Sequence, residues 1–230
     1  MEMSRRVDPE WLDELPAEDP RALRSRRDIA RINLIMANAG VVAGELRGRI
    51  SGAGVRLAEI GAGDGVFALR VARSLPRFEK AQLTLLDRQQ GIAPDLLGEF
   101  ARLGWQASPV QADVFQWLRA AGTPRFDAIV ANLFLHHFER EKLRELLALV
   151  AARASLFVAC EPRRSRVAML GSRLLGLAGC NDVTRHDAVV SVRAGFDGRE
   201  LGDLWPDARG WRLEERARGL FSHSFVAVRG

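Results

Sequence analysis

Three glycines, Gly61, Gly63 and Gly65, alternate in a short turn that follows an apolar run at residues 55–60. An apolar run that enters such a turn predicts a buried parallel strand. The apolar spacing of residues 66–75 predicts a helix that begins where the turn ends. Glycine lets the backbone approach a ligand, and the first turn of a helix offers free N–H groups to an anionic part of it. This segment therefore predicts a strand, a turn and a helix that bind a nucleotide-like ligand.

Two acids beside the turn, Glu59 and Asp64, indicate the charge of that ligand. A dinucleotide-binding turn has the spacing G-x-G-x-x-G, whereas Val66 stands where its last glycine would be. Two carboxylates also repel a pyrophosphate, but they attract a cation. The pattern thus favours a positively charged ligand over a dinucleotide. Simple packing of the strand on the helix is the alternative reason for the glycines.

The segment from Glu59 to Gly65 reads E-x-G-x-G-x-G and resembles the first motif of the class I S-adenosylmethionine-dependent methyltransferases. In that family the motif holds the methionine end of the cofactor, whose sulfonium and ammonium groups are cations of the kind that the acids suit. The resemblance implies S-adenosylmethionine as the cofactor. It also implies cofactor contacts from Glu59, Gly61, Ala62 and Gly63.

Acids follow the next two predicted strands as well. Asp87 ends the predicted strand 81–87, about 20 residues beyond the glycine turn, where an acid can accept both ribose hydroxyls. Asp113 follows the third predicted strand, and the resemblance implies that it accepts the adenine amino group. The same carboxylate can cap the next helix. The predicted cofactor site is completed by Arg88, Val114 and Asn132.

The fourth predicted strand lies within residues 126–138 and leads into the string NLFLHHF. Ligands of open α/β sheets bind outside the carboxyl ends of the strands, so this loop is expected near the transferred methyl group. Methyltransferases that act on DNA bases carry an Asn- or Asp-Pro-Pro-aromatic motif here, and the absence of proline after Asn132 argues against that substrate class. LHHF instead resembles small-molecule enzymes of the ubiquinone-biosynthesis type. His136 follows that pattern better and is a candidate base, and His137 is a candidate substrate contact.

Residues 163–200 lie where this fold usually builds its substrate wall. Much of this segment is apolar and interrupted by glycine, which fits a hydrophobic pocket and equally fits amphipathic helix packing. His186 beside Asp187 is the other candidate general base, since neutral imidazole has a suitable pKa. Asp187 has the alternative role of a helix cap. Further predicted substrate contacts are Met36, Glu161 and Arg163. Asn132 and Glu161 are also expected to act as orienting groups.

Strands and helices alternate from residue 55 onward, which predicts an α/β fold with helices on both faces of the sheet. The expected sheet is doubly wound, Rossmann-like, mostly parallel and seven-stranded, with one antiparallel strand. A helix predicted from about residue 21 to 47, with a break at Gly40, precedes it. We therefore assign residues 1–50 to an N-terminal helical lid and residues 51–230 to the methyltransferase domain.

Composition excludes several other classes. The 230 residues, 47% of them hydrophobic, suffice for one core but not for two full domains. No apolar run approaches the ~20 residues of a membrane span, and no signal core precedes Pro9, so we expect a soluble, cytoplasmic protein without membrane insertion. The net charge of +5 comes from arginines scattered along the chain, which argues against nucleic-acid binding. Cys160 and Cys180 form no C-x-x-C, so neither a disulfide nor a metal site is predicted.

The whole chain also looks like small bacterial enzymes that are encoded near type III polyketide synthases. That resemblance implies O-methylation of a phenolic or pyrone hydroxyl of a polyketide-type small molecule, by a monomer or a homodimer. The expected reaction is in-line displacement at the sulfonium methyl, for which the enzyme aligns the reactants and removes the hydroxyl proton. Two alternatives stay open, namely C-methylation of a quinone precursor and a non-catalytic cofactor-binding protein on the same fold.

Overall fold

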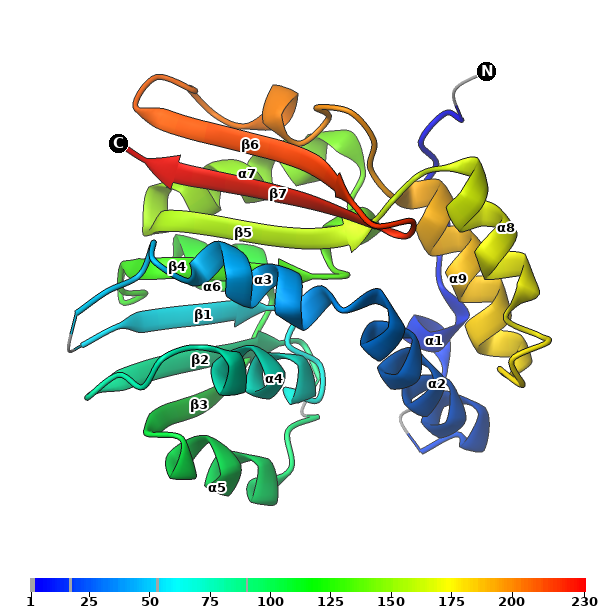
Figure 1. Ribbon diagram of the computed structural model, residues 1–230, viewed down its shortest axis with the longest axis horizontal. Coiled ribbons are helices and arrows are strands. Elements are labelled where there is room, and N and C mark those ends of the chain that lie inside the picture. Colours follow the sequence, from blue (N-terminus) through cyan, green and yellow to red (C-terminus); the bar gives the residue numbers. More distant parts are fainter. Residues whose placement is uncertain (1–2, 17, 53, 90) are drawn as a thin grey trace.

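The computed structural model describes residues 3–16, 18–52, 54–89 and 91–230. Seven strands form one sheet in the order β3-β2-β1-β4-β5-β7-β6 (Figure 1). β7 runs antiparallel to both of its neighbours, and the remaining pairs are parallel. The predicted sheet with one antiparallel strand is thus confirmed. The bounds are β1 Arg56–Ile60, β2 Ala81–Asp87, β3 Trp105–Gln111, β4 Phe126–Asn132, β5 Ala154–Pro162, β6 Trp211–Arg218 and β7 Ser222–Arg229.

Helices cover both faces of the sheet (Figure 1). Successive residues of a strand point to opposite faces, and β4 therefore places Ala128 and Val130 in one apolar cluster and Ile129 and Ala131 in the other. This two-sided burial explains why the central strands read as continuous apolar runs. One cluster is closed by α3 Asn38–Leu46, α4 Val66–Ser74 and α5 Pro94–Arg102, and the other by α6 Val114–Arg119, α7 Arg140–Arg153 and the short helix η2 Gly202–Leu204.

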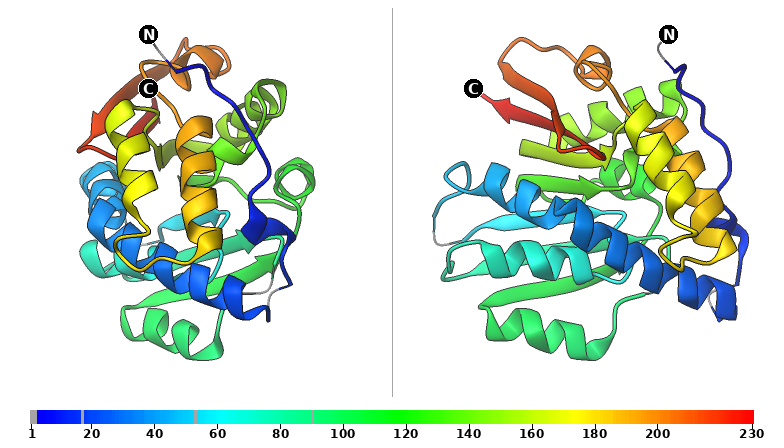
Figure 2. Two further views of the ribbon diagram at one scale, coloured as in Figure 1. Left: turned by 90° about the vertical axis from the view of Figure 1, so that its right-hand side faces the viewer. Right: turned by 45° about the vertical axis from the view of Figure 1, so that its right-hand side comes forward.

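A third group of helices lies beyond the carboxyl ends of the parallel strands, on the right of Figure 1. It consists of α1 Trp11–Glu14, α2 Pro20–Met36, α8 Arg166–Leu174 and α9 Asp182–Ala194. Figure 2 shows that the N-terminal segment crosses beside α9, although the two are far apart in the sequence. The short helix η1 Leu135–His137 follows β4 and contacts α9. The edge of the sheet where ligands are expected is therefore covered by helices.

The long N-terminal helix of the prediction is two helices. The chain breaks at Ala37, which has a left-handed φ of 53°, and not at Gly40. The side chain of Asn38 is fully buried and bonded at this point, which fixes the start of α3. α3 packs in the core against the sheet, whereas α2 stands at its edge. No single helix of the described residues is long and apolar enough to cross a membrane; α2 and α3 reach that length and composition only as a pair bent by 56°.

The N-terminal segment is fixed to α9 by defined contacts. Asp187, which is buried in α9, accepts hydrogen bonds from the backbone N–H groups of Trp11 and Leu12, at 2.9 and 3.0 Å. The Trp11 ring stacks on His186, with the ring centroids 3.9 Å apart and the planes at 6°. Closer to the N-terminus, the guanidinium of Arg5 donates hydrogen bonds to the backbone carbonyls of Ala194 and Phe138. These contacts hold α1 over the loop that follows β4.

We expect Asp187→Ala to release this segment. The change removes the acceptor of two N–H groups, a loss of roughly 1–3 kcal/mol, while the sheet and its core remain. Hydrogen exchange followed by mass spectrometry should show faster exchange in residues 3–16, with the strands unchanged. Asp203→Ala, at an exposed position of η2, is the matched control. Equal exchange of residues 3–16 in the two variants would show that Asp187 does not anchor α1.

Candidate active site

The glycine turn lies at the carboxyl end of β1, where all three glycines have left-handed φ angles of 73°, 55° and 75°. A side chain at Gly61 would collide with the ring of Phe134. A side chain at Gly63 would meet nothing within 4 Å. Gly61 is therefore required by the packing of the protein, whereas Gly63 leaves space in which a ligand can approach the backbone.

Asp87 is held beside this turn. One oxygen of its carboxylate, Oδ2, accepts the N–H of Gly63 at 2.9 Å, and the other, Oδ1, accepts the N–H of Gln89 at 2.9 Å. A carboxylate offers about four lone-pair sites, so both oxygens can still accept hydroxyl groups. The structure thus brings together Asp87 and Gly63, two of the residues that the sequence analysis assigned to the cofactor. Arg88 is exposed just beyond it.

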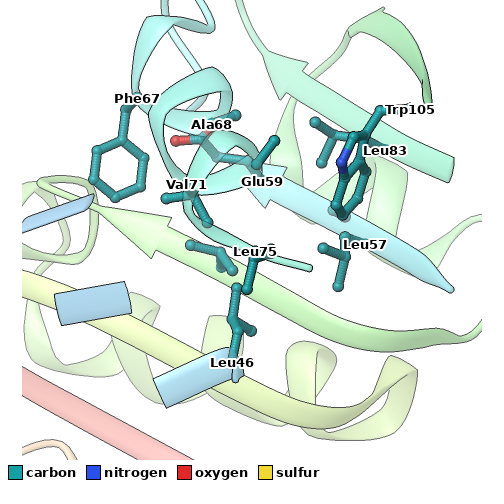
Figure 3. Close-up of a pocket in the computed structure, with 12 residues that line it drawn as sticks. Leu46, Leu57, Glu59, Phe67, Ala68, Val71, Leu75, Leu83 and Trp105 are labelled. Carbon is teal, nitrogen blue, oxygen red and sulfur yellow. The ribbon is translucent and has the colours of Figure 1, made fainter. Parts of the chain in front are cut away.

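Glu59 is the unusual group of the site. Its carboxylate is 3% exposed and lies near the start of α4, and its Oε2 atom has no hydrogen-bond partner. Figure 3 shows apolar side chains around it, among them Leu57, Phe67 and Val71. Burial is the main cause that raises the pKa of Glu59 well above its usual range, with the charges of Asp64 and Asp87 adding to it. Glu59 therefore has no positively charged partner in the protein, and a cationic ligand beside it would favour its ionised form.

Asp113 caps α6, as the alternative reading of the sequence foresaw. Its Oδ1 atom accepts the N–H groups of Phe115 and Gln116, each at 3.0 Å. The Oδ2 atom takes no part in these two bonds, so the cap leaves an acceptor for an amino group. The neighbouring Val114 side chain is buried in the core cluster beneath this position.

The loop after β4 is held in a strained conformation. Leu133 has a left-handed φ of 51°, which is rare for a bulky residue and concentrates at functional sites. Its backbone N–H donates to the carbonyl of Cys160 at 3.0 Å. The buried Asn132 accepts a hydrogen bond from Asn38 at 3.0 Å, and Asn38 in turn accepts one from Ser222 at 2.7 Å. These bonds connect the end of β4 to the start of α3 and to β7.

Glu161 holds the same loop through hydrogen bonds. It is fully buried, and its Oε1 atom accepts the N–H groups of Phe134 and Leu135 at 3.0 and 2.9 Å. Its Oε2 atom lies 2.8 Å from Nδ1 of His136. Because both oxygens are used by the loop, the geometry favours the orienting role that the sequence analysis gave Glu161 over a direct substrate contact.

His136 lies between two carboxylates. Its ring is 3% exposed, with Glu161 at Nδ1 and the Oε1 atom of Glu10 at 3.4 Å from Nε2. Burial lowers the pKa of His136, but the two carboxylates outweigh it and raise the pKa to about 9. An imidazole whose two nitrogens both face carboxylates has no lone pair directed at a substrate. This geometry argues against the predicted role of His136 as the catalytic base.

The other two candidate histidines are less enclosed. His137 has Nδ1 3.6 Å from the carboxylate of Asp13, and burial together with the charge of His136 lowers its pKa. His186 has Nδ1 2.9 Å from Asp187, which leaves Nε2 as the nitrogen that can accept a proton. Asp187 lies inside α9, whose cap is Asn181, so the helix-cap alternative for Asp187 is wrong. His186 stays the candidate base.

The last two predicted substrate contacts, Met36 and Arg163, are partly exposed. Met36 is half-buried at the end of α2, and Arg163 is half-buried after β5, with one guanidinium nitrogen 3.4 Å from the carbonyl of Gly219. Sequence reasoning missed Glu10 and Asp13, which the N-terminal segment brings to the two adjacent histidines. The only sequence signal for these two residues was their position in an acidic segment, and such a segment does not indicate which residues they contact.

Residues 57–154 match the family model described as a methyltransferase domain. Solved structures share the fold. An O-methyltransferase family protein from Burkholderia thailandensis is 16% identical with a TM-score of 0.57, over 93% of this chain and 61% of that one. The pyocyanin biosynthetic protein PhzM is 19% identical with a TM-score of 0.61, over 96% and 62%. The mitomycin 7-O-methyltransferase MmcR is 17% identical with a TM-score of 0.56, over 95% and 60%.

Residues 57–154 thus match a methyltransferase domain, and the fold around them is the one that these solved structures share. The sequence predicts S-adenosylmethionine as the cofactor, and the buried carboxyl of Glu59, whose Oε2 atom has no hydrogen-bond partner, fits a cationic ligand of this kind. The chain spans about 60% of the length of these matched structures. No curated protein matches it. At identities below 25% the structural likeness establishes the fold, and the substrate has to be argued from the site.

We expect Glu59→Gln to stabilise the ligand-free protein and to weaken cofactor binding. Because the folded-state pKa of Glu59 is raised, the buried carboxyl loses stability as the pH rises from its usual value of 4.5 through the raised value. Glutamine does not ionise, so the gain in unfolding free energy should grow between about pH 5.5 and about pH 8. Urea denaturation at both pH values measures it. A variant no more stable than the wild type at the higher pH would contradict the assigned cause.

Gly61 and Gly63 form a matched pair for a second test. Both glycines have left-handed φ angles, so alanine strains the backbone at either position. Alanine at Gly63 meets no neighbour and places a methyl group in the open space, so it should fold and bind the cofactor at least about tenfold more weakly. Alanine at Gly61 must displace Phe134 and should lower the melting temperature more than Gly63→Ala does. Thermal unfolding and titration with S-adenosylhomocysteine separate the two effects. Unchanged affinity in Gly63→Ala would exclude the open space as the cofactor site.

Proposed function

We propose that the protein transfers the methyl group of S-adenosylmethionine to a hydroxyl oxygen of a small molecule, a phenol or pyrone of polyketide type. The observation that carries this proposal is the cover over the site. α1, α9 and the N-terminal segment lie over the carboxyl ends of the strands, and Asp187 bonds them together. An acceptor beneath this cover has to be small. The O-methyltransferases among the matched structures support oxygen as the acceptor atom.

The cofactor supplies an activated methyl group from its sulfonium centre. We assign its cationic methionine end to Glu59, because that buried carboxylate has an unpartnered oxygen. The backbone from Gly61 to Gly63 is the proposed cradle, with Asp87 as the ribose acceptor. We further assign the adenine amino group to the free oxygen of Asp113. The remaining proposed contacts are Ala62, Arg88, Val114 and Asn132.

His186 is the proposed proton acceptor. Asp187 fixes its Nδ1, and this leaves Nε2 to take the hydroxyl proton while the same carboxylate stabilises the charged ring. Stacking on Trp11 restricts the ring to one plane. A substrate hydroxyl that is already ionised would need no such base. The partly exposed residues Met36, His137 and Arg163 are the proposed substrate contacts. The protein is proposed to be a cytoplasmic monomer or homodimer.

The first experiment is calorimetric titration with S-adenosylhomocysteine. We expect the wild type and the control Asp203→Ala to bind it, and Asp87→Ala to bind at least about tenfold more weakly because the ribose acceptor is lost. The absence of binding to the wild type would overturn the assignment of the cofactor site.

The second experiment tests the acceptor atom and the base. Phenols, pyrones and quinone precursors are incubated with cofactor that carries a ¹³C-labelled methyl group, and the carbon chemical shift of the product distinguishes O-methyl from C-methyl. We expect O-methyl products, with the turnover of His186→Ala reduced by about 10²-fold or more. A C-methyl product would establish the quinone alternative. Binding of the cofactor without any product would favour a non-catalytic protein.

A further inference from the structure

A second set of ligating side chains lies where the N-terminal segment meets the loop after β4. Glu10, His136 and His137 each offer one ligand atom, and these atoms all lie within 4.8 Å of one another. The proposed methyl transfer uses neither Glu10 nor the ring of His136. Only the fold brings Glu10 to the adjacent residues His136 and His137.

The distance between Glu10 and His136 fits two ligands of one ion. Oε1 of Glu10 is 3.4 Å from Nε2 of His136, which is longer than the about 2.7–3.2 Å of a good hydrogen bond. Two ligand atoms that sit about 2.0–2.1 Å from a tetrahedral zinc ion are about 3.4 Å apart. The partly exposed imidazole of His137 can turn to complete the set, since its ring centroid is 4.3 Å from that of His136.

The surroundings of His136 resemble the outer shell of a metal site. A histidine that binds a metal through one nitrogen usually donates its other N–H to a carboxylate or a carbonyl, and this fixes the direction of the ring. Glu161 occupies that position for His136, at 2.8 Å from Nδ1, so Nε2 of this ring faces Glu10. The carboxylate of Asp13 is 3.6 Å from Nδ1 of His137, which is too far for a hydrogen bond, so it does not fix the partly exposed His137 ring.

The charges converging on this point also call for a cation. Glu10 and Asp13 bring two carboxylates to the two imidazoles, beside Glu161, which is already bonded by two backbone N–H groups and the His136 ring. Buried carboxylates are stable only when they are paired, hydrogen-bonded or bound to a metal. A divalent ion would compensate the negative charges of Glu10 and Asp13.

We propose that Glu10, His136 and His137 bind one divalent ion of the zinc class, with Glu161 and Asp13 as the outer carboxylates. Two imidazoles and one carboxylate form a ligand set that zinc uses, with the fourth position open to water or to another oxygen ligand. The ion joins the N-terminal segment to the loop after β4 and so closes the cover. This site does not depend on the chain being a methyltransferase.

Metal binding is tested on protein treated with a chelator. We expect calorimetry to show one zinc ion per chain, cobalt(II) to give the visible absorption of a tetrahedral N/O site, and zinc to raise the melting temperature. His137→Ala and Glu10→Gln should each weaken zinc binding at least about tenfold, and the outer-shell change Glu161→Gln should weaken it about 10–100-fold. Glu14→Gln, at an exposed position of the same helix as Asp13, is the matched control and should bind like the wild type.

Each variant is also titrated with S-adenosylhomocysteine. A variant that binds it like the wild type is folded, so its loss of zinc binding is specific to the metal site. Failure of the wild type to bind S-adenosylhomocysteine would overturn the proposed function and leave the metal result standing. The absence of a cobalt(II) absorption band, or equal zinc affinity in the wild type and His137→Ala, would overturn the metal site.

Discussion

The buried carboxylate of Glu161 is the group on which the covered edge of the sheet depends. A carboxylate without partners is very costly to bury, and this one receives two backbone N–H groups and the ring of His136. These bonds hold the loop after β4 in the conformation that Leu133 makes strained. That loop carries His136 and His137, which are the partners of Glu10 and Asp13 from the N-terminal segment. The position of the N-terminal segment over the sheet edge therefore depends on the carboxylate of Glu161 at the end of β5.

Glu59 is a buried carboxylate in the opposite situation. Glu161 is fully bonded by its own chain, whereas one oxygen of Glu59 faces apolar side chains without a partner. Glu161 therefore stabilises the fold of the loop, whereas Glu59 has an oxygen that a cationic ligand can bind. Unsatisfied groups of this kind cluster at functional sites, where stability is lost in exchange for binding. The contrast explains why two acids of equal burial have different proposed roles.

Much of the fold could be predicted because its signals are local. The apolar run, the glycine turn and the helix spacing predicted β1 and α4, and continuous apolar strands predicted a sheet buried on both faces. The position of Asp87 followed from the end of its strand. The break at Ala37 could not be predicted, because Gly40 carries the stronger local signal and the true break is set by Asn38, whose partners are Asn132 and Ser222. Contacts of that kind leave no periodic pattern.

The sequence by itself determined the class of the fold, the cofactor motif and the order of the acids at the strand ends, since each depends on neighbouring residues and on spacing along one element. Only the tertiary structure decided what the histidines do. It placed His136 between Glu161 and Glu10, and His186 between Asp187 and Trp11. The protonation and the ligands of an imidazole depend on the charges within a few ångströms of it. Those charges come from distant parts of the chain, which only folding brings together.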